Sequence, residues 1–192
     1  MLPYEFSAER FTRWMAYALR HNPARYGLQP DRHGYVDVDE FLTIARRRYP
    51  QMTPEQLRQL IQDGDVGRFE LMEGRVRARY GHSISVDPAG PPVEPPERLY
   101  HATEASRVET IFSHGLSPME RRMLHLSESL DDAVAVAQRR SSQPVIIRVD
   151  ALAASRAGVA FYREGRVYLA PHIPSAFLHR EPLPAASDTP AG

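Results

Sequence analysis

The stretch DPAGPPVEPPE, Asp87–Glu97, decides how the chain folds, because it divides the sequence into two parts. It holds five prolines, at positions 88, 91, 92, 95 and 96. Proline lacks the backbone N–H that helices and central strands need, and proline-rich segments act as semi-rigid spacers. We therefore predict two domains, over residues 1–86 and 98–180, joined by a linker at 87–97.

The part before the linker shows three amphipathic helix patterns. The first follows Ser7, a favoured N-cap residue, and is predicted to end at Arg20–His21. Its apolar residues recur at helical spacing, at Phe11, Trp14, Met15, Ala18 and Leu19. The second and third helices begin at Asp37 and at Thr53, each of which has a Glu or Gln three positions later, as in a capping box.

Two short strands are predicted after these helices. The runs 68–72 and 76–80 are joined by Glu73–Arg75, which contains a glycine and predicts a compact hairpin. Three helices followed by a hairpin are typical of a winged helix, which we predict for residues 1–86.

The part after the linker alternates short strands with helices. The sequence pattern predicts strands at 98–103, 123–127, 144–150, 159–162 and 167–170, and helices at 104–113 and 131–140. The whole chain is thus predicted to be α+β, with a strand-rich second domain. The final stretch, EPLPAASDTPAG at 181–192, is rich in Pro, Ala and Ser and is predicted to be a disordered tail.

The composition excludes several kinds of site. All 24 basic residues of the 192-residue chain are arginines, and there is no cysteine. The missing cysteine excludes disulfides, thiolate nucleophiles and thiolate zinc sites. The missing lysine, which we attribute to genomic base composition, means that an anion site must use arginine, histidine or backbone N–H groups.

The charges are evenly spread between the two parts. Residues before position 87 carry 13 Arg against 11 acidic residues, and the rest carry 11 against 13, which gives net charges of +2 and −2. Broad electrostatic capture of long nucleic acids is therefore not expected. No run of 18 apolar residues and no signal-peptide pattern occurs, so we expect a cytoplasmic protein that makes no use of a membrane.

Four segments together resemble one enzyme family. They are ALRHNPARYGLQPDRHGYVDVDEFL (18–42), GRFELMEGRVRARYGHSI (67–84), LYHAT with GLSPMERRMLHLS (99–103 and 115–127), and PVIIRVDALAASRAGVAFYREGRVYLAPHIPSAFL (144–178). In this order and spacing the chain is similar to the RNA 2'-phosphotransferases, also called tRNA 2'-phosphotransferases. The resemblance covers almost the whole chain.

This resemblance implies a winged-helix RNA lobe and an ADP-ribosyltransferase-like lobe that binds NAD. The implied reaction needs no metal and serves tRNA processing. The 2'-phosphate of an RNA first displaces nicotinamide from NAD, and the ribose 2''-hydroxyl then attacks the phosphorus. RNA with a free 2'-hydroxyl, nicotinamide and ADP-ribose 1'',2''-cyclic phosphate result. We expect a monomer whose partners are NAD and an RNA bearing a 2'-phosphate.

The resemblance implies four catalytic residues, Arg20, His21, Arg68 and Arg121. Taken alone, Arg20–His21 reads as a cationic helix end that complements the helix dipole, and Arg68 as a solvent-facing strand residue. The chemistry suits the implied roles, because charge develops on phosphoryl oxygens and fixed cations stabilise it. Histidine titrates near neutral pH, so His21 can transfer a proton. Arg122 is a competitor for the role of Arg121.

For NAD, the resemblance implies contacts with His101, Ala102, Thr103, His125, Ser127 and Arg140. His125 and Ser127 alternate along a strand and therefore share a face. The sequence departs from the family pattern at Ala102 and Gln138 and at Ser142, where glycine is usual, and at Met123, where histidine is frequent. These departures bear on NAD affinity and on rate.

The wing arginines Arg75, Arg77 and Arg79 also alternate and share a face, where they either contact RNA backbone or form a solvated surface.

Two other functions stay open. One is a non-enzymatic winged-helix regulator that senses a nucleotide. The other is an ADP-ribosyltransferase acting on protein or on nucleic-acid ends, although the ExE or QxE stretch of the arginine-modifying type is missing from the sequence.

Overall fold

The computed structural model describes residues 7–63, 67–138 and 144–182, which belong to two compact units. The first unit comprises Met1–Pro91 with two short later segments, Met119–Arg122 and Glu164–Arg166, and the second comprises the remainder. The division between Pro91 and Pro92 lies within the predicted linker. The two later segments, in contrast, lie where the sequence predicted only the second domain.

Three helices of the first unit begin at the predicted caps: α1 (Ala8–Arg20), α2 (Val38–Arg48) and α3 (Pro54–Asp63). The Ser7 hydroxyl accepts from the N–H of Arg10, and the Asp37 carboxylate accepts from two N–H groups of α2. At α3 the capping box is reciprocal, since Thr53 and Gln56 each bond the backbone N–H of the other at 3.0 and 3.1 Å. A short 3-10 helix, η1 (Pro23–Tyr26), follows α1.

The first unit also contains a three-stranded antiparallel sheet in the order β1-β3-β2. Its strands are β1 (Val36–Asp37), β2 (Phe69–Met72) and β3 (Arg75–Ala78). The predicted three-residue turn was wrong, because Arg75 pairs with Met72 and only Glu73 and Gly74 form the turn. Both have positive φ, 50° and 73°, as a tight two-residue hairpin requires.

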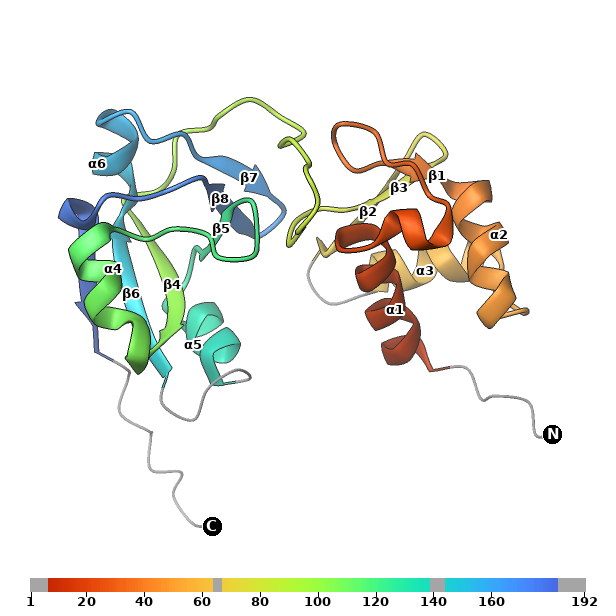
Figure 1. Ribbon diagram of the computed structural model, residues 1–192, viewed down its shortest axis with the longest axis horizontal. Coiled ribbons are helices and arrows are strands. Elements are labelled where there is room, and N and C mark those ends of the chain that lie inside the picture. Colours follow the sequence, from red (N-terminus) through yellow and green to blue (C-terminus); the bar gives the residue numbers. More distant parts are fainter. Residues whose placement is uncertain (1–6, 64–66, 139–143, 183–192) are drawn as a thin grey trace, which may run out of the picture. The chain divides into compact units, whose positions relative to one another are not determined.

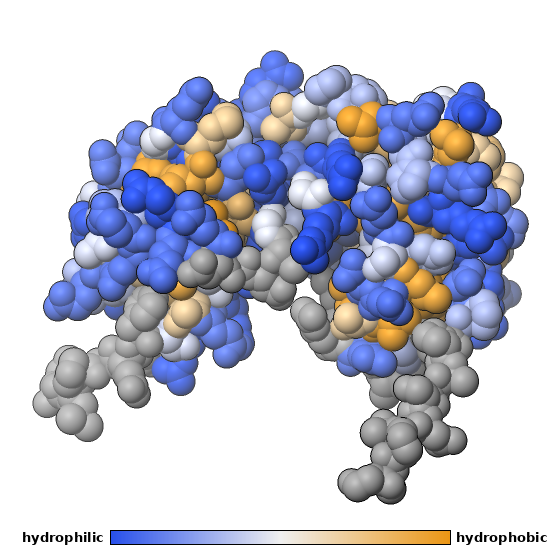
Figure 2. Space-filling view, turned by 180° about the vertical axis from the view of Figure 1, so that it is seen from behind, coloured by the Kyte–Doolittle hydropathy of each residue, from blue (hydrophilic) through white to orange (hydrophobic). Residues whose placement is uncertain are grey.

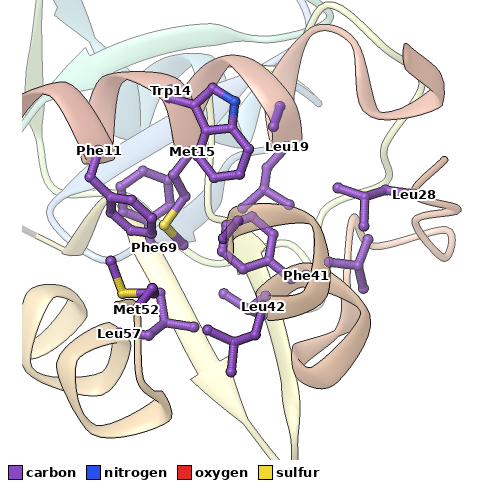
Figure 3. Close-up of a cluster of buried hydrophobic side chains, with 14 of the residues drawn as sticks. Phe11, Trp14, Met15, Leu19, Leu28, Phe41, Leu42, Met52, Leu57 and Phe69 are labelled. Atoms are coloured by element: carbon purple, nitrogen blue, oxygen red, sulfur yellow. The ribbon is translucent and has the colours of Figure 1, made fainter. Parts of the chain in front are cut away.

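A single apolar core joins these elements, as Figure 3 shows. Phe11, Met15 and Leu19 of α1 pack with Phe41 of α2 and Phe69 of β2, and each is at most 6% exposed. This packing brings the C-terminal end of α1 close to the residues that flank the β2–β3 hairpin. The core thereby positions Arg20 beside Phe69.

The second unit is built on a six-stranded sheet in the order β7-β8-β5-β4-β6-β9. Its strands are β4 (Arg98–Glu104), β5 (Leu124–Ser127), β6 (Pro144–Asp150), β7 (Tyr162–Glu164), β8 (Val167–Ala170) and β9 (Leu178–Glu181). Its helices are η3 (Ala105–Arg107), α4 (Val108–His114), α5 (Leu130–Gln138), α6 (Ala151–Arg156) and η4 (Ser175–Phe177). The pairs β4–β5, β4–β6, β5–β8 and β6–β9 are antiparallel, and helices accompany this antiparallel sheet, which confirms the α+β class.

The two faces of this sheet are covered differently. Figure 1 shows α4 and α5 on opposite sides of β4 and β6. The larger core, with Leu99, Ile147 and Phe161, includes Ile111 of α4, while a smaller cluster joins Ile146 to alanines of α5. Alternate residues of β4 and β6 therefore enter different cores, as the period of two in a strand dictates.

Several predicted boundaries in this unit need correction. The strand predicted at 159–162 begins only at Tyr162, and the backbone oxygen of Phe161 instead accepts from the N–H of Val93 at 2.7 Å. The sequence prediction missed α6 and β9, and Glu181, placed in the tail, is the last residue of β9. The rest of the predicted tail, from 183 on, lies outside the described residues, as does the end of the helix predicted at 131–140.

Within the described ranges, the helices are all too short or too polar to cross a bilayer. Figure 2 shows a face on which hydrophilic residues dominate and apolar residues lie in separate areas.

Candidate active site

Arg20 and His21 stand at the end of α1, and Arg20 is turned toward the protein. Its guanidinium carbon lies 5.7 Å from the ring centroid of Phe69 and 5.3 Å from that of Tyr80. Gly81, at φ +89°, passes so close that a Cβ there would lie 3.4 Å from Arg20 Cδ and Nη1. Arg20 is therefore a packed residue of the fold and differs from an ordinary solvated cationic helix end.

Several donors here are buried without an internal acceptor. Arg20 Nε and Nη2 and Arg68 Nε have no hydrogen-bond partner among the described residues. A guanidinium has donors only, and leaving a buried donor unsatisfied costs on the order of 1–3 kcal/mol. This donor set fits an anionic acceptor such as a phosphate group, which would bond several of these groups at once.

Electrostatic effects show that further cations are close. The pKa of Arg20 is lowered to about 10, chiefly by burial. The charges of Arg68 and Arg121 also lower it, while the charge of Tyr80 raises it. Burial, followed by the charges of Arg20 and Arg121, also lowers the pKa of His21. The structure thus brings the four predicted catalytic residues, Arg20, His21, Arg68 and Arg121, together in the first unit.

The competing residues Arg121 and Arg122 are placed differently. Arg121 is half-buried and its charge acts on both Arg20 and His21. Arg122 is exposed, and its backbone N–H donates to the carbonyl oxygen of His82 at 3.4 Å. This arrangement favours Arg121 as the member of the site.

His82 lies in the same cluster, although sequence reasoning did not select it. Its side chain is 7% exposed, and its Nε2 is buried without a hydrogen-bond partner among the residues that the structure describes. Burial, and then the charges of Arg20, Arg77 and His21, lower the pKa of His82 to about 4. The GHS sequence at 81–83 was the only signal that could have pointed to it.

His82 is expected to make the stability of the protein depend on pH. Its pKa is about 4 in the folded state and about 6.5 in the unfolded chain, so between these values only the unfolded chain takes up the proton. The free energy of unfolding should then fall as the pH falls through this window, by about 3 kcal/mol in total, since one pKa unit corresponds to about 1.4 kcal/mol. Urea unfolding of the wild type and of His82→Gln from pH 7 to pH 4 measures the effect.

Carboxylates also titrate in this range, so the informative quantity is the difference between the two proteins. His82→Gln removes the titrating ring, and its unfolding free energy should vary less with pH. Parallel curves for the two proteins would show that His82 does not carry this dependence. His33→Gln, which changes a partly exposed histidine of the same unit, is the control.

The wing arginines share a face, as predicted, but that face is packed. Arg75 and Arg77 lie over the ring of Tyr35, at 4.8 and 4.9 Å. All three guanidinium nitrogens of Arg77 bond carboxylates of Glu70 and Glu164, and its side chain is 4% exposed. This position favours a structural role for Arg77. Arg79 pairs with Glu70 at 2.8 Å and is partly exposed, and Arg75 pairs with Asp31 at the surface.

The residues predicted for NAD lie in the second unit, on β4 and β5. His125 and Ser127 are half-buried between the buried Leu124 and Leu126, which confirms that they share a face. Ser127 is paired with Tyr100, so this is the face of Tyr100 and Ala102. By the same alternation, His101 and Thr103 belong to the other face of β4. Arg140 lies outside the described residues, as does Ser142.

The ring of His101 is oriented by the neighbouring strand. Its Nδ1 lies 3.0 Å from the backbone oxygen of His125. A carbonyl oxygen only accepts, so Nδ1 carries the proton and donates, and Nε2 of the neutral ring is an acceptor. The bond fixes His101 relative to β5.

Among the residues that the structure describes, no three His, Asp or Glu side chains come together in a way that could hold a metal ion.

Comparison with known proteins places this geometry in context. Residues 7–172 match the model of a family described as RNA 2'-phosphotransferase, Tpt1 / KptA family. A probable RNA 2'-phosphotransferase of Streptomyces coelicolor is 38% identical over 91% of this chain and 96% of its own length. Proteins of the same name from Acetivibrio thermocellus and Pyrococcus abyssi are 37% and 35% identical, over 90% and 86% of this chain and 96% and 91% of their own lengths.

Proposed function

Because the chain belongs to the RNA 2'-phosphotransferase, Tpt1 / KptA family, we propose that it removes an internal 2'-phosphate from RNA by transferring it to NAD. One observation supports this above all others. Three arginine charges and His21 converge in the first unit, and buried guanidinium donors there have no acceptor among the described residues. This set of donors and charges supports the binding of one phosphate group.

The proposed reaction has two displacement steps. A 2'-phosphate oxygen attacks the anomeric carbon of the nicotinamide riboside, and the glycosidic bond breaks to release neutral nicotinamide. The ribose 2''-hydroxyl then loses its proton and attacks the phosphorus, and the bond from phosphorus to the RNA 2'-oxygen breaks. That oxygen takes up a proton, which leaves RNA with a 2'-hydroxyl and ADP-ribose 1'',2''-cyclic phosphate.

The residues of the first unit suit the second step. Arg20, Arg68 and Arg121 would neutralise the charge that develops on the phosphoryl oxygens. His21 would exchange the proton, and its lowered pKa keeps a larger share of the ring neutral near pH 6 than an ordinary histidine would have. A neutral ring can accept a proton from an attacking hydroxyl.

We propose that the second unit is the ADP-ribosyltransferase-like lobe and holds NAD through His101, Ala102, Thr103, His125, Ser127 and Arg140. The orientation of His101 supports this, because the bond from Nδ1 to the backbone oxygen of His125 fixes the ring relative to β5. The first unit would act as a winged-helix RNA lobe. Arg75 and Arg79, which are both partly exposed, are better placed than the buried Arg77 to contact RNA backbone.

Incubation with NAD and a short RNA bearing one internal 2'-phosphate tests the function. We expect nicotinamide release and loss of the 2'-phosphate in equal amounts, without added metal and in the presence of a chelator. Matched RNA with a 2'-hydroxyl at that position should release no nicotinamide above background. A 2'-phosphate that persists at every pH from 5 to 9 would contradict the proposal. Nicotinamide release with ADP-ribose joined to an RNA end would favour ADP-ribosyl transfer instead.

A further inference from the structure

The segment Tyr80–Ser83, just after β3, encloses the end of α1. Tyr80 lies under the Arg20 guanidinium, and Gly81 packs against the same side chain. The backbone N–H of Ser83 donates to the carbonyl oxygen of Arg20 at 3.0 Å. The main chain of this segment thus holds the main chain of the helix end.

A second bond joins the side chains. Ser83 Oγ lies 3.0 Å from Nδ1 of His21, across 62 positions of sequence. His21 is exposed, and the ring of Tyr17 lies 6.1 Å away between centroids. The charges of Arg20, Arg121 and Glu120 act on His21, and its own charge acts on His82, but within the described ranges Ser83 is the group that bonds its ring. An exposed imidazole would otherwise rotate about its side-chain bonds, so the Ser83 hydroxyl is the group that restrains it.

We propose that Ser83 is a positioning residue that holds Nδ1 of His21 and thereby makes Nε2 the nitrogen that exchanges a proton with the substrate. The proposal rests on the proposed function, in which His21 acts at the phosphoryl group. Ser83 itself touches neither RNA nor NAD in this scheme and acts through His21.

A hydroxyl is well suited to this task because it both donates and accepts. When Nδ1 lacks a proton, the Ser83 hydroxyl donates to it. When Nε2 takes up a proton and the ring becomes an imidazolium, both nitrogens carry protons and Nδ1 donates to Ser83 Oγ. The hydrogen bond therefore survives the proton transfer, with rotation of the hydroxyl hydrogen alone and no movement of the ring.

The variant Ser83→Ala isolates this bond, since the backbone bond from residue 83 to Arg20 remains. Ser83→Thr keeps a hydroxyl and is the conservative rescue. Ser85→Ala, which changes an exposed serine two residues further on, is the matched control. Two readouts are needed: nitrogen-15 NMR of the His21 ring between pH 5 and 8, and the single-turnover rate of 2'-phosphate loss.

We expect Ser83→Ala to shift the His21 ring nitrogens toward the tautomer mixture of a free imidazole and to lower the rate about tenfold, which is the order expected for one net hydrogen bond. The acid limb of its pH–rate profile should move as well. Ser83→Thr should stay within about threefold of the wild type, and Ser85→Ala should be unchanged in both readouts.

Unchanged ring-nitrogen shifts in Ser83→Ala would overturn the proposal, and so would an unchanged rate. A Ser83→Thr protein as slow as Ser83→Ala would overturn it too, because the hydroxyl would then not be the relevant group. If the wild type itself releases no nicotinamide, the proposed function fails, while the comparison of ring-nitrogen shifts still decides whether Ser83 holds His21.

Discussion

Replacement of Arg121 by alanine is expected to lower the rate of 2'-phosphate removal by on the order of 10² to 10³. Its charge acts on both Arg20 and His21, which places it at the proposed phosphoryl site. A preorganised cation stabilises the transition state more than the ground state, so its loss should appear in the chemical rate more than in RNA affinity.

The matched control is Arg122→Ala. Arg122 is exposed and contributes a backbone N–H, which alanine retains, so its rate should stay near that of the wild type. Single-turnover reactions with labelled RNA separate the two steps. We expect Arg121→Ala to accumulate RNA that carries ADP-ribose on its 2'-phosphate, because the second step needs the charge most. If Arg122→Ala were instead the slower of the two variants, Arg122 would be the arginine that stabilises the phosphoryl charge.

Replacement of Arg77 by alanine is expected to lower the free energy of unfolding by about 3 to 5 kcal/mol. Although burial opposes the charge, the hydrogen bonds with Glu164 and Glu70 raise the pKa of Arg77. Removing the guanidinium leaves the Glu164 carboxylate, which is 5% exposed, without its bidentate partner. Glu164 keeps only two long contacts, Arg79 Nη1 at 4.0 Å and the N–H of Ala89 at 3.4 Å, which replace the lost pair only in part, and a poorly paired buried charge is far more costly than the pair.

Arg75→Ala is the control on the same strand. Arg75 pairs with Asp31 at the surface, with 42% and 38% of the two side chains exposed, so we expect a loss of about 0 to 1 kcal/mol. Urea denaturation measures both variants. RNA affinity, corrected for the folded fraction, should change little in Arg77→Ala. A fully stable Arg77→Ala protein with weakened RNA binding would contradict the structural role and would show instead that Arg77 contacts RNA.

Local features of the fold were predictable from the sequence, because they depend on neighbouring residues. Ser7, Asp37 and Thr53 cap their helices through N–H groups at most three positions away. The strand 144–150 was predicted with its correct limits, since a compact apolar run signals burial. In contrast, β1 has two residues and exists only because β3 lies beside it, so no pattern within it could reveal it.

The candidate site was predictable only in part. Arg20, His21, Arg68 and Arg121 were selected through the family resemblance, while sequence spacing alone favoured a plain helix end and a solvated strand. His82 and Ser83 were not selected, although the GHS sequence at 81–83 lies within a segment that carries the resemblance, because histidine and serine after a strand have no helical or strand period that would reveal a role. Strand alternation correctly placed Arg75 and Arg77 on one face, but it could not show that Tyr35, Glu70 and Glu164 cover that face.

The sequence by itself determined the α+β class and the requirement that an anion site be built from arginine and histidine, since these follow from composition and short-range pattern. Only the tertiary structure decided which cations converge. Arg20, Arg68 and Arg121 lie far apart along the chain, and the charge of each acts on its neighbours only because packing brings α1, the β2–β3 hairpin and Met119–Arg122 together. Burial also removes water from the guanidinium donors, so that an anion is the acceptor that would satisfy their hydrogen bonds.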